Sequence, residues 1–177
     1  MSPVFMALLP KLHLNRHTSP AIIPGPEELG GLALPHLFTL QGIDKIKLFV
    51  GHLRIRDRTA KLIHIDLSYI QLILGIKEFF INLDHALYQW VEAGWITSLW
   101  EFVSTSQLSF DYPMHWHPAI PRENDGTLMD HFTSLKLPST VLGTLNHCRL
   151  YLQVITISDI TAANGLFILQ RIRDGLR

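Results

Sequence analysis

The chain has 177 residues, with 15 Lys and Arg against 15 Asp and Glu, so its formal net charge is zero and its estimated isoelectric point is about 7.2. This balance argues against a strongly basic nucleic-acid module, an acidic tail and a polybasic membrane binder, because each needs an excess of one charge. Hydrophobic residues make up 47% of the chain and charged residues 17%. That composition is typical of a folded protein and excludes a disordered one.

Length and cysteine content narrow the class of protein further. A chain of this length is typical of one domain. The single cysteine, Cys148, excludes an internal disulfide framework and a multi-cysteine zinc site, which favours a reducing compartment, cytoplasmic or nuclear. Residues 1–10 lack a basic region, and the longest apolar stretch, 62–76, is shorter than the roughly 18 to 20 residues that cross a bilayer. We therefore expect neither a signal peptide nor a membrane segment.

Proline dominates residues 1–36, which contain six of the ten prolines of the chain. Because proline restricts the backbone and lacks an N–H, this segment is predicted to consist of extended pieces and turns. Two short apolar runs, 21–23 and 31–34, flank a Pro-Gly-Pro sequence and two glutamates. The pattern predicts a small hairpin or a paired extended arm.

Helical periodicity characterises residues 37–108, a predicted helical region. Apolar residues three and four apart predict a helix over 41–54, and Asp57 is placed to cap a second one. A short helix is expected from Asp84 to near Gly94, and another over 97–107. The helix after Asp57 has an apolar stripe that Ile63 and Ile70 broaden, so we expect burial on more than one side. The stripe consists of Leu62, Ile65, Tyr69, Leu72 and Ile73.

The second half of the chain begins with residues 109–124, whose three prolines predict a loop. The C-terminal helical region, 125–177, then opens with a short helix after Asp125 that stops before Pro138. Ser139 is expected to cap the next helix, and a last helical stretch starts at Asp159 and breaks near Gly165. The apolar stripe of the helix after Ser139 is Val141, Leu142, Leu145, Cys148, Leu152 and Ile155.

Together these segments predict a single, mainly α domain. Its expected architecture is an irregular multi-helix bundle with a Pro/Gly-rich N-terminal extended segment or small hairpin.

Ten histidines raise the question of a metal site. His115 and His117 would lie on the same side of an extended segment and could supply two ligands. The alternative is a pair of solvated loop histidines, which the absence of a further His or Cys at a familiar spacing favours. His13 and His17 are four apart but lack the glutamate of a helical zinc-protease box. We expect no metal and no cofactor.

No catalytic motif occurs in the sequence. There is no Gly-x-Ser-x-Gly turn, no glycine-rich phosphate loop and no adjacent pair of aspartates. Cys148 lies between His147 and Arg149, which could lower the pKa of a thiol, but its place on an apolar stripe favours a buried core thiol. The chain is therefore not expected to be an enzyme on its own.

One cationic cluster stands out in this neutral chain. Arg54, Arg56, Arg58 and Lys61 occur within eight residues that contain a single acid, Asp57. These side chains could contact the phosphate backbone of a nucleic acid if the turn between the two helices is tight. The alternative is an ordinary solvated turn. The four tryptophans allow a similar pair of interpretations, base stacking or core packing, and the helical spacing favours the core.

Several segments in fixed order resemble a known family. They are Leu-Asn-Arg at 14–16, Gly-Pro at 25–26, Gly-Gly-Leu-Ala-Leu-Pro-His-Leu at 30–37, Gln-Gly-Ile at 41–43, Gly-His-Leu-Arg at 51–54, Asp-Arg-Thr at 57–59, Gly-Trp-Ile-Thr-Ser-Leu-Trp-Glu-Phe at 94–102 and Asn-His-Cys-Arg-Leu-Tyr-Leu-Gln-Val at 146–154. This set resembles the region C-terminal to the polymerase palm in retroelement reverse-transcriptase proteins of the non-LTR type. The resemblance covers about residues 9–165.

The resemblance implies a thumb-like or connector region of a larger polyprotein, whose helices would contact an RNA or DNA duplex. The family's catalytic box, with its two aspartates, has no counterpart here, and Ala33 replaces a glycine that is frequent in the Gly-Gly element. We therefore expect a catalytically inert fragment with weak nucleic-acid backbone contact. The alternative is a free-standing helical interaction module, whose mean hydropathy of +0.20 indicates apolar surface that a protein partner or a missing domain would cover.

Overall fold

The computed structural model describes residues 9–15, 17–112, 122 and 125–175. Its internal contacts divide the chain into two compact units, residues 1–43 and 44–177. Most of the predicted loop at 109–124 lies outside the described residues.

The first unit is built from turns that backbone hydrogen bonds hold together. Two short 3-10 helices, η1 (Pro20–Ile22) and η2 (Glu27–Leu29), replace the expected extended strands. The two apolar runs are nevertheless paired, because Leu32 N–H donates to Ile22 O at 2.9 Å and Leu34 N–H donates to Ile23 O at 3.0 Å. A Cβ on Gly31 would lie 2.1 Å from the Gly25 carbonyl oxygen, so only glycine fits this crossing.

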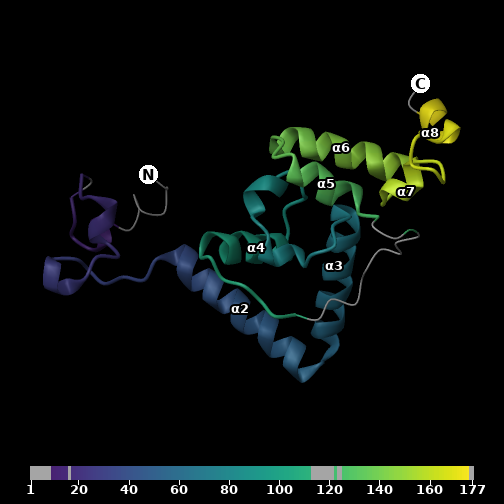
Figure 1. The fold of residues 1–177 in the computed structure, drawn as a ribbon. Helices are drawn as coiled ribbons and strands as arrows, with labels where there is room; N and C mark the ends of the chain where they lie inside the picture. The colour runs from purple at the N-terminus through teal and green to yellow at the C-terminus, as the bar shows by residue number, and fades with distance from the viewer. Residues whose placement is uncertain (1–8, 16, 113–121, 123–124, 176–177) are drawn as a thin grey trace. The chain divides into compact units, whose positions relative to one another are not determined.

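Two long helices meet at a tight corner (Figure 1): α2 (Leu37–Ile55) and α3 (Arg58–Leu74). The helix α2 begins four residues before the predicted start. Asp57 caps α3 as predicted, since its carboxylate accepts a hydrogen bond from Ala60 N–H at 2.8 Å. The turn itself depends on Arg56, whose φ of 58° is in the left-handed region.

The main apolar stripe predicted for α3 is not its buried face, although Ile63 and Ile70, which the sequence predicts to broaden the buried surface, are buried. Leu62, Ile65, Tyr69 and Leu72 are exposed, and Ile73 is half-buried. The face that contacts the core carries Ala60, Ile63, Leu67, Ile70 and Leu74 instead. Both faces contain apolar residues at helical spacing, and the core selects the second one because it packs against α4 and the segment after α3.

The segment after α3 forms the centre of the second unit. It contains η3 (Phe80–Asn82), η4 (His85–Tyr88) and α4 (Trp95–Thr105). Asp84 caps η4 as predicted, but η4 is a short 3-10 helix that ends at Tyr88 rather than near Gly94. The helix α4 begins and ends two residues earlier than the predicted 97–107. Trp100 is fully buried, and its indole N–H donates to Leu83 O at 2.8 Å, so this tryptophan is a core residue.

The C-terminal helices pack beside this centre. They are α5 (Leu128–Ser134), α6 (Ser139–Leu152), α7 (Ile157–Ile160) and α8 (Gln170–Gly175). The predicted cap at Ser139 is wrong by one position, since Ser139 is the first helical residue and Pro138 precedes it. Cys148 is exposed rather than buried, because the inward face of α6 presents Leu142, Asn146 and Arg149.

The described residues are mainly helical and contain only isolated β-bridges, which confirms the predicted fold class. Within those residues, none of the helices combines the length and the apolar character required to cross a membrane.

Candidate functional site

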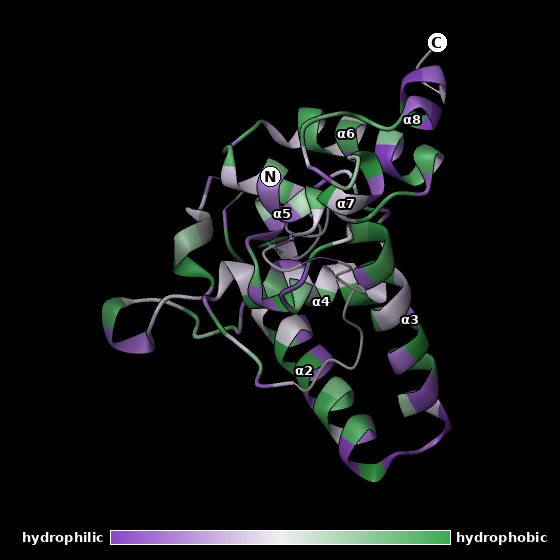
Figure 2. Ribbon diagram, turned by 45° about the vertical axis from the view of Figure 1, so that its right-hand side comes forward, coloured by the Kyte–Doolittle hydropathy of each residue, from purple (hydrophilic) through white to green (hydrophobic). Residues whose placement is uncertain are grey.

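The four predicted cations lie together at the α2–α3 corner. Arg54 is in the last turn of α2, Arg56 forms the turn, and Arg58 and Lys61 are in the first turn of α3. All four side chains are exposed, and none forms a hydrogen bond or ion pair with another described residue. We call these four residues the basic corner. The connection between α2 and α3 is hydrophilic, as its purple colour shows (Figure 2).

The one acid of this segment is fully engaged. Asp57 accepts from Ala60 N–H through Oδ1 and pairs through Oδ2 with His52 Nδ1 at 2.7 Å. The hydrogen bond from the Ala60 backbone, followed by that of His52, lowers the pKa of the Asp57 carboxyl below its ordinary value. Asp57 therefore leaves the four neighbouring cations without a carboxylate partner.

An exposed apolar stripe starts at this corner and follows α3. Leu62 and Ile65 are each 65% exposed, Tyr69 is 58% exposed and Leu72 is 45% exposed. Their spacing of three, four and three residues places them on one helix face, and Arg58 lies in line with them one turn before Leu62. We call these four apolar residues the outer stripe.

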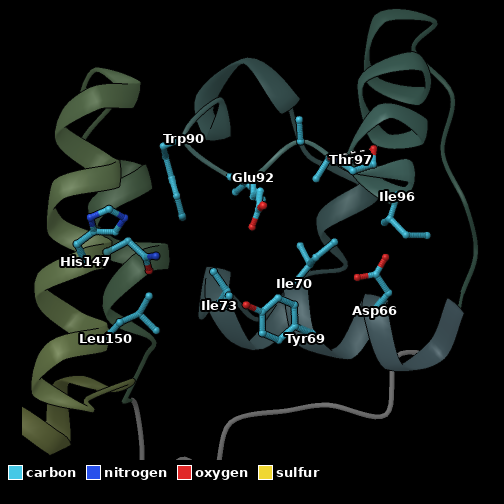
Figure 3. Close-up of a pocket in the computed structure, with 14 residues that line it drawn as sticks. Asp66, Tyr69, Ile70, Ile73, Trp90, Glu92, Ile96, Thr97, His147 and Leu150 are labelled. Atoms are coloured by element: carbon cyan, nitrogen blue, oxygen red, sulfur yellow. Dashed lines mark hydrogen bonds between the residues drawn. The ribbon is translucent and has the colours of Figure 1, made fainter. Parts of the chain in front are cut away.

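A pocket opens between α3, the turn before α4, and α6 (Figure 3). Its cavity volume is about 360 Å³. Ile70, Ile96 and Thr97 form buried walls, and Tyr69 and His147 lie at exposed positions of the lining. Sequence patterns do not reveal this pocket, because its three sides come from separate segments, the first and last of which are Asp66 and Leu150.

Two residues of the pocket lining each have a buried polar atom without a partner in the described part of the chain. They are Asn146 Nδ2 and Trp90 Nε1. Asn146 has no exposed surface, and its Oδ1 accepts from Arg149 Nε at 3.0 Å, which fixes the amide and directs Nδ2 away from Arg149. Trp90 packs over Gly143 of α6, where a Cβ would lie 2.8 Å from the indole Cγ.

Within the described residues, the other candidates from the sequence form no site. His115, His117 and Trp116 lie outside the described residues. His13 and His17 are exposed and belong to the first unit. No group of three His, Cys, Asp or Glu side chains is arranged to hold a metal ion in the ranges that the structure describes.

Known proteins do not indicate the role of the basic corner, the outer stripe or the pocket. No model of a protein family, no curated protein and no solved structure matches this chain.

Proposed function

We propose that the protein is a helical interaction module whose docking surface is the outer stripe together with the basic corner. The observation that supports this proposal is the exposure of the stripe, four large apolar residues in register on a single helix face. Contiguous apolar surface with a charged border is typical of protein interaction sites, whereas scattered exposed apolar residues are not.

The partner that fits this surface is an amphipathic helix with acidic residues at one end. Its apolar side chains would cover Leu62, Ile65 and Tyr69, and its acidic end would lie against Arg58 and Lys61, which have no carboxylate partner among the described residues. The cations fix the direction of the docked helix because they occupy only one end of the stripe.

A pair of synthetic peptides tests the proposal. Both carry leucines at helical spacing; one has several glutamates at one end and the other has lysines there. We expect the acidic peptide to bind at least tenfold more tightly, and the double variant Leu62→Gln/Ile65→Gln to lose that binding, because burying each side chain contributes about 1.5 to 3 kcal/mol. The control is Leu135→Gln, a leucine of α5's C-terminal cap with the same 65% exposure.

Two results would contradict this function. One is equal affinity for the two peptides. The other is a stable dimer in light scattering that the double variant Leu62→Gln/Ile65→Gln dissociates into monomers. That result would mean that a second copy of the chain covers the outer stripe.

The basic corner supports a second candidate function, in which the chain is a catalytically inert, thumb-like fragment of a retroelement protein. Four exposed cations without partners among the described residues are suited to phosphate groups. With about three contacts, binding to an RNA–DNA duplex should fall with salt at a log–log slope of roughly −2 to −3. Replacement of all four residues by alanine should abolish it.

Absence of duplex binding at low salt, or equal binding by the alanine variant, would rule out this second candidate. Its retroelement origin has a separate test in the genomic sequence. A palm-encoding reading frame, intact or decayed, should precede the coding sequence of residue 1.

A further inference from the structure

The pocket between α3 and α6 lies alongside the outer stripe. Tyr69 belongs to both, because it is a member of the stripe and also lines the pocket. At about 100° per helical residue, Asp66 and Ile73 lie on α3 between the stripe and the buried face. Asp66 and Tyr69 are roughly 12 to 16 Å along the helix axis from Arg58 of the basic corner. A helix docked on the outer stripe therefore passes beside this pocket about two to three turns after the basic corner.

Two exposed carboxylates of the pocket lining have no cationic partner among the described residues. They belong to Asp66 of α3 and Glu92 of the turn before α4, and neither forms an ion pair or hydrogen bond within the described ranges. None of the described residues that line the pocket is a lysine or an arginine. Figure 3 shows the Glu92 side chain extending toward α3, the helix that carries Asp66. The pocket thus has the opposite charge to the basic corner.

Much of the remaining lining is apolar or aromatic. Ile70 and Ile73 of α3, Ile96 of α4 and Leu150 of α6 contribute apolar surface, and Tyr69 contributes a ring that is 58% exposed. A volume of about 360 Å³ is at the lower end of the range for small-molecule sites. An arginine side chain matches such a lining, because its stem is apolar and its planar guanidinium stacks on aromatic rings and donates in several directions.

We propose that this pocket receives an arginine side chain of the helix that docks on the outer stripe, with the guanidinium at Asp66 and Glu92. The site rests on the proposed function, since it needs a docked helix, and it adds a requirement on the sequence of the partner. The partner carries acidic residues at one end and an arginine about two to three turns further along. If the acidic end is N-terminal, both charges also interact favourably with the dipole of the partner helix. Reversed docking would place the acidic end against Asp66 and Glu92, so the two charged sites together select one direction.

Calorimetric titration of the full chain with three synthetic peptides tests the site. All three have glutamates at the N-terminal end and leucines at helical spacing. The first has an arginine about ten residues after the glutamates, and the second has methionine at that position. In the third, the arginine is moved by two residues, to the other side of the helix. We expect the first peptide to bind at least about fivefold more tightly than either of the others, because it alone places a guanidinium at the two carboxylates.

Substitutions in the pocket locate the bound arginine. Asp66→Asn and Glu92→Gln each remove one charge at an exposed position, so they leave folding intact. Each should at least halve the advantage of the arginine peptide over the methionine peptide, and the double variant should abolish that advantage. Neither should change the affinity for the methionine peptide. The control is Glu101→Gln, which removes an exposed carboxylate of α4 outside the pocket lining and should keep the whole advantage.

Equal affinity for the arginine and methionine peptides would overturn the arginine site, as would an advantage that the double variant Asp66→Asn/Glu92→Gln retains. The proposed function would stand in both cases if Leu62→Gln/Ile65→Gln still abolishes binding of the peptides. Tighter binding of the methionine peptide would mean that an apolar side chain fills the pocket, which also overturns the site. If none of the three peptides binds, the proposed function fails and the arginine site fails with it.

Discussion

The basic corner and Arg149 show two opposite environments for the same guanidinium group. At the corner, Arg54, Arg56 and Arg58 are exposed and have no side-chain partner among the described residues. Arg149 of α6 is 4% exposed and donates to Asn146 Oδ1 at 3.0 Å, to Val154 O at 3.4 Å and to Ile73 O. An arginine thus stabilises the fold where carbonyl oxygens surround its guanidinium group. Where no such oxygens lie nearby, the guanidinium group remains available to a binding partner.

The carbonyls around Arg149 also have a common origin. Those of Leu72 and Ile73 belong to the last turn of α3, where no further helical N–H is in place to pair with them. A positive charge at this end of a helix also interacts favourably with the helix dipole. Burial lowers the pKa of Arg149, which is the expected effect of removing water from a cation. Arg149 therefore joins α6 to the end of α3 without any carboxylate.

The largest effect is expected when Arg149 is removed. Arg149→Met should lower the free energy of unfolding by about 3 kcal/mol, because it leaves several buried carbonyls and Asn146 Oδ1 without donors. Urea unfolding with an unchanged slope measures the loss. Arg54→Met is the matched control at the basic corner and should change stability by less than about 0.5 kcal/mol. Equal effects of the two substitutions would remove the distinction between the two environments.

A smaller loss is expected at Gly75, which ends α3 beside Arg149. Its φ is +63°, and an added Cβ would lie 2.6 Å from Arg149 Cζ. Gly75→Ala should therefore cost about 1 to 2 kcal/mol, the sum of backbone strain and displacement of the guanidinium. Gly165→Ala is the control, with a φ of +70° and no atom within 4 Å of the added Cβ. If the two variants lose the same stability, the contact with Arg149 contributes nothing.

A pH-dependent effect is expected at Asp57, the acid beside the basic corner. Its pKa is lower in the folded chain than its ordinary value of 3.8, so its stabilisation is complete above pH 3.8 and disappears as the pH falls through the folded value. Asp57→Asn keeps the helix cap and removes the charge. The stability difference between wild type and this variant should thus be largest near neutral pH and vanish at strongly acidic pH. Chemical unfolding across that range measures it, and a constant difference would contradict the assignment.

The smallest effect is expected at Arg56, and it has the opposite sign. Because its φ of 58° is unfavourable for a side chain with a Cβ, Arg56→Gly should stabilise the chain by up to about 1 kcal/mol. The matched change Arg54→Gly, within α2, should destabilise it by about 0.5 to 1 kcal/mol. Thermal unfolding of the two variants gives the signs directly. A loss of stability in Arg56→Gly would indicate a contact of its side chain that holds the corner in place.

Local features of the fold could be predicted because they depend on neighbours in sequence. The caps at Asp57 and Asp84 are examples, since each carboxylate pairs with a backbone N–H two or three residues away. The start of α2 was less predictable, because residues 37–40 lack the periodic pattern. The clustering of the four cations of the basic corner could also be predicted, because these residues are close neighbours in sequence. Nucleic-acid binding by the basic corner stays a prediction.

The buried face of α3 and the pocket were beyond prediction for a different reason. The helix carries apolar residues on two faces, and periodicity alone does not say which face meets the core. The pocket depends on Asn146 and Trp90, 56 positions apart, which only tertiary packing brings to one cavity. Arg149 likewise acts on α3 carbonyls more than 70 positions away. The same packing turned Cys148 outward.

The exposure of Cys148 has a practical consequence for every measurement of association. As the single thiol of the chain, it would couple two copies through a disulfide under oxidising conditions, and that covalent dimer would imitate non-covalent assembly in light scattering. A reducing buffer removes this ambiguity. The same exposed thiol is a single attachment point for a fluorophore, so the chain can be labelled at one position without any engineered site.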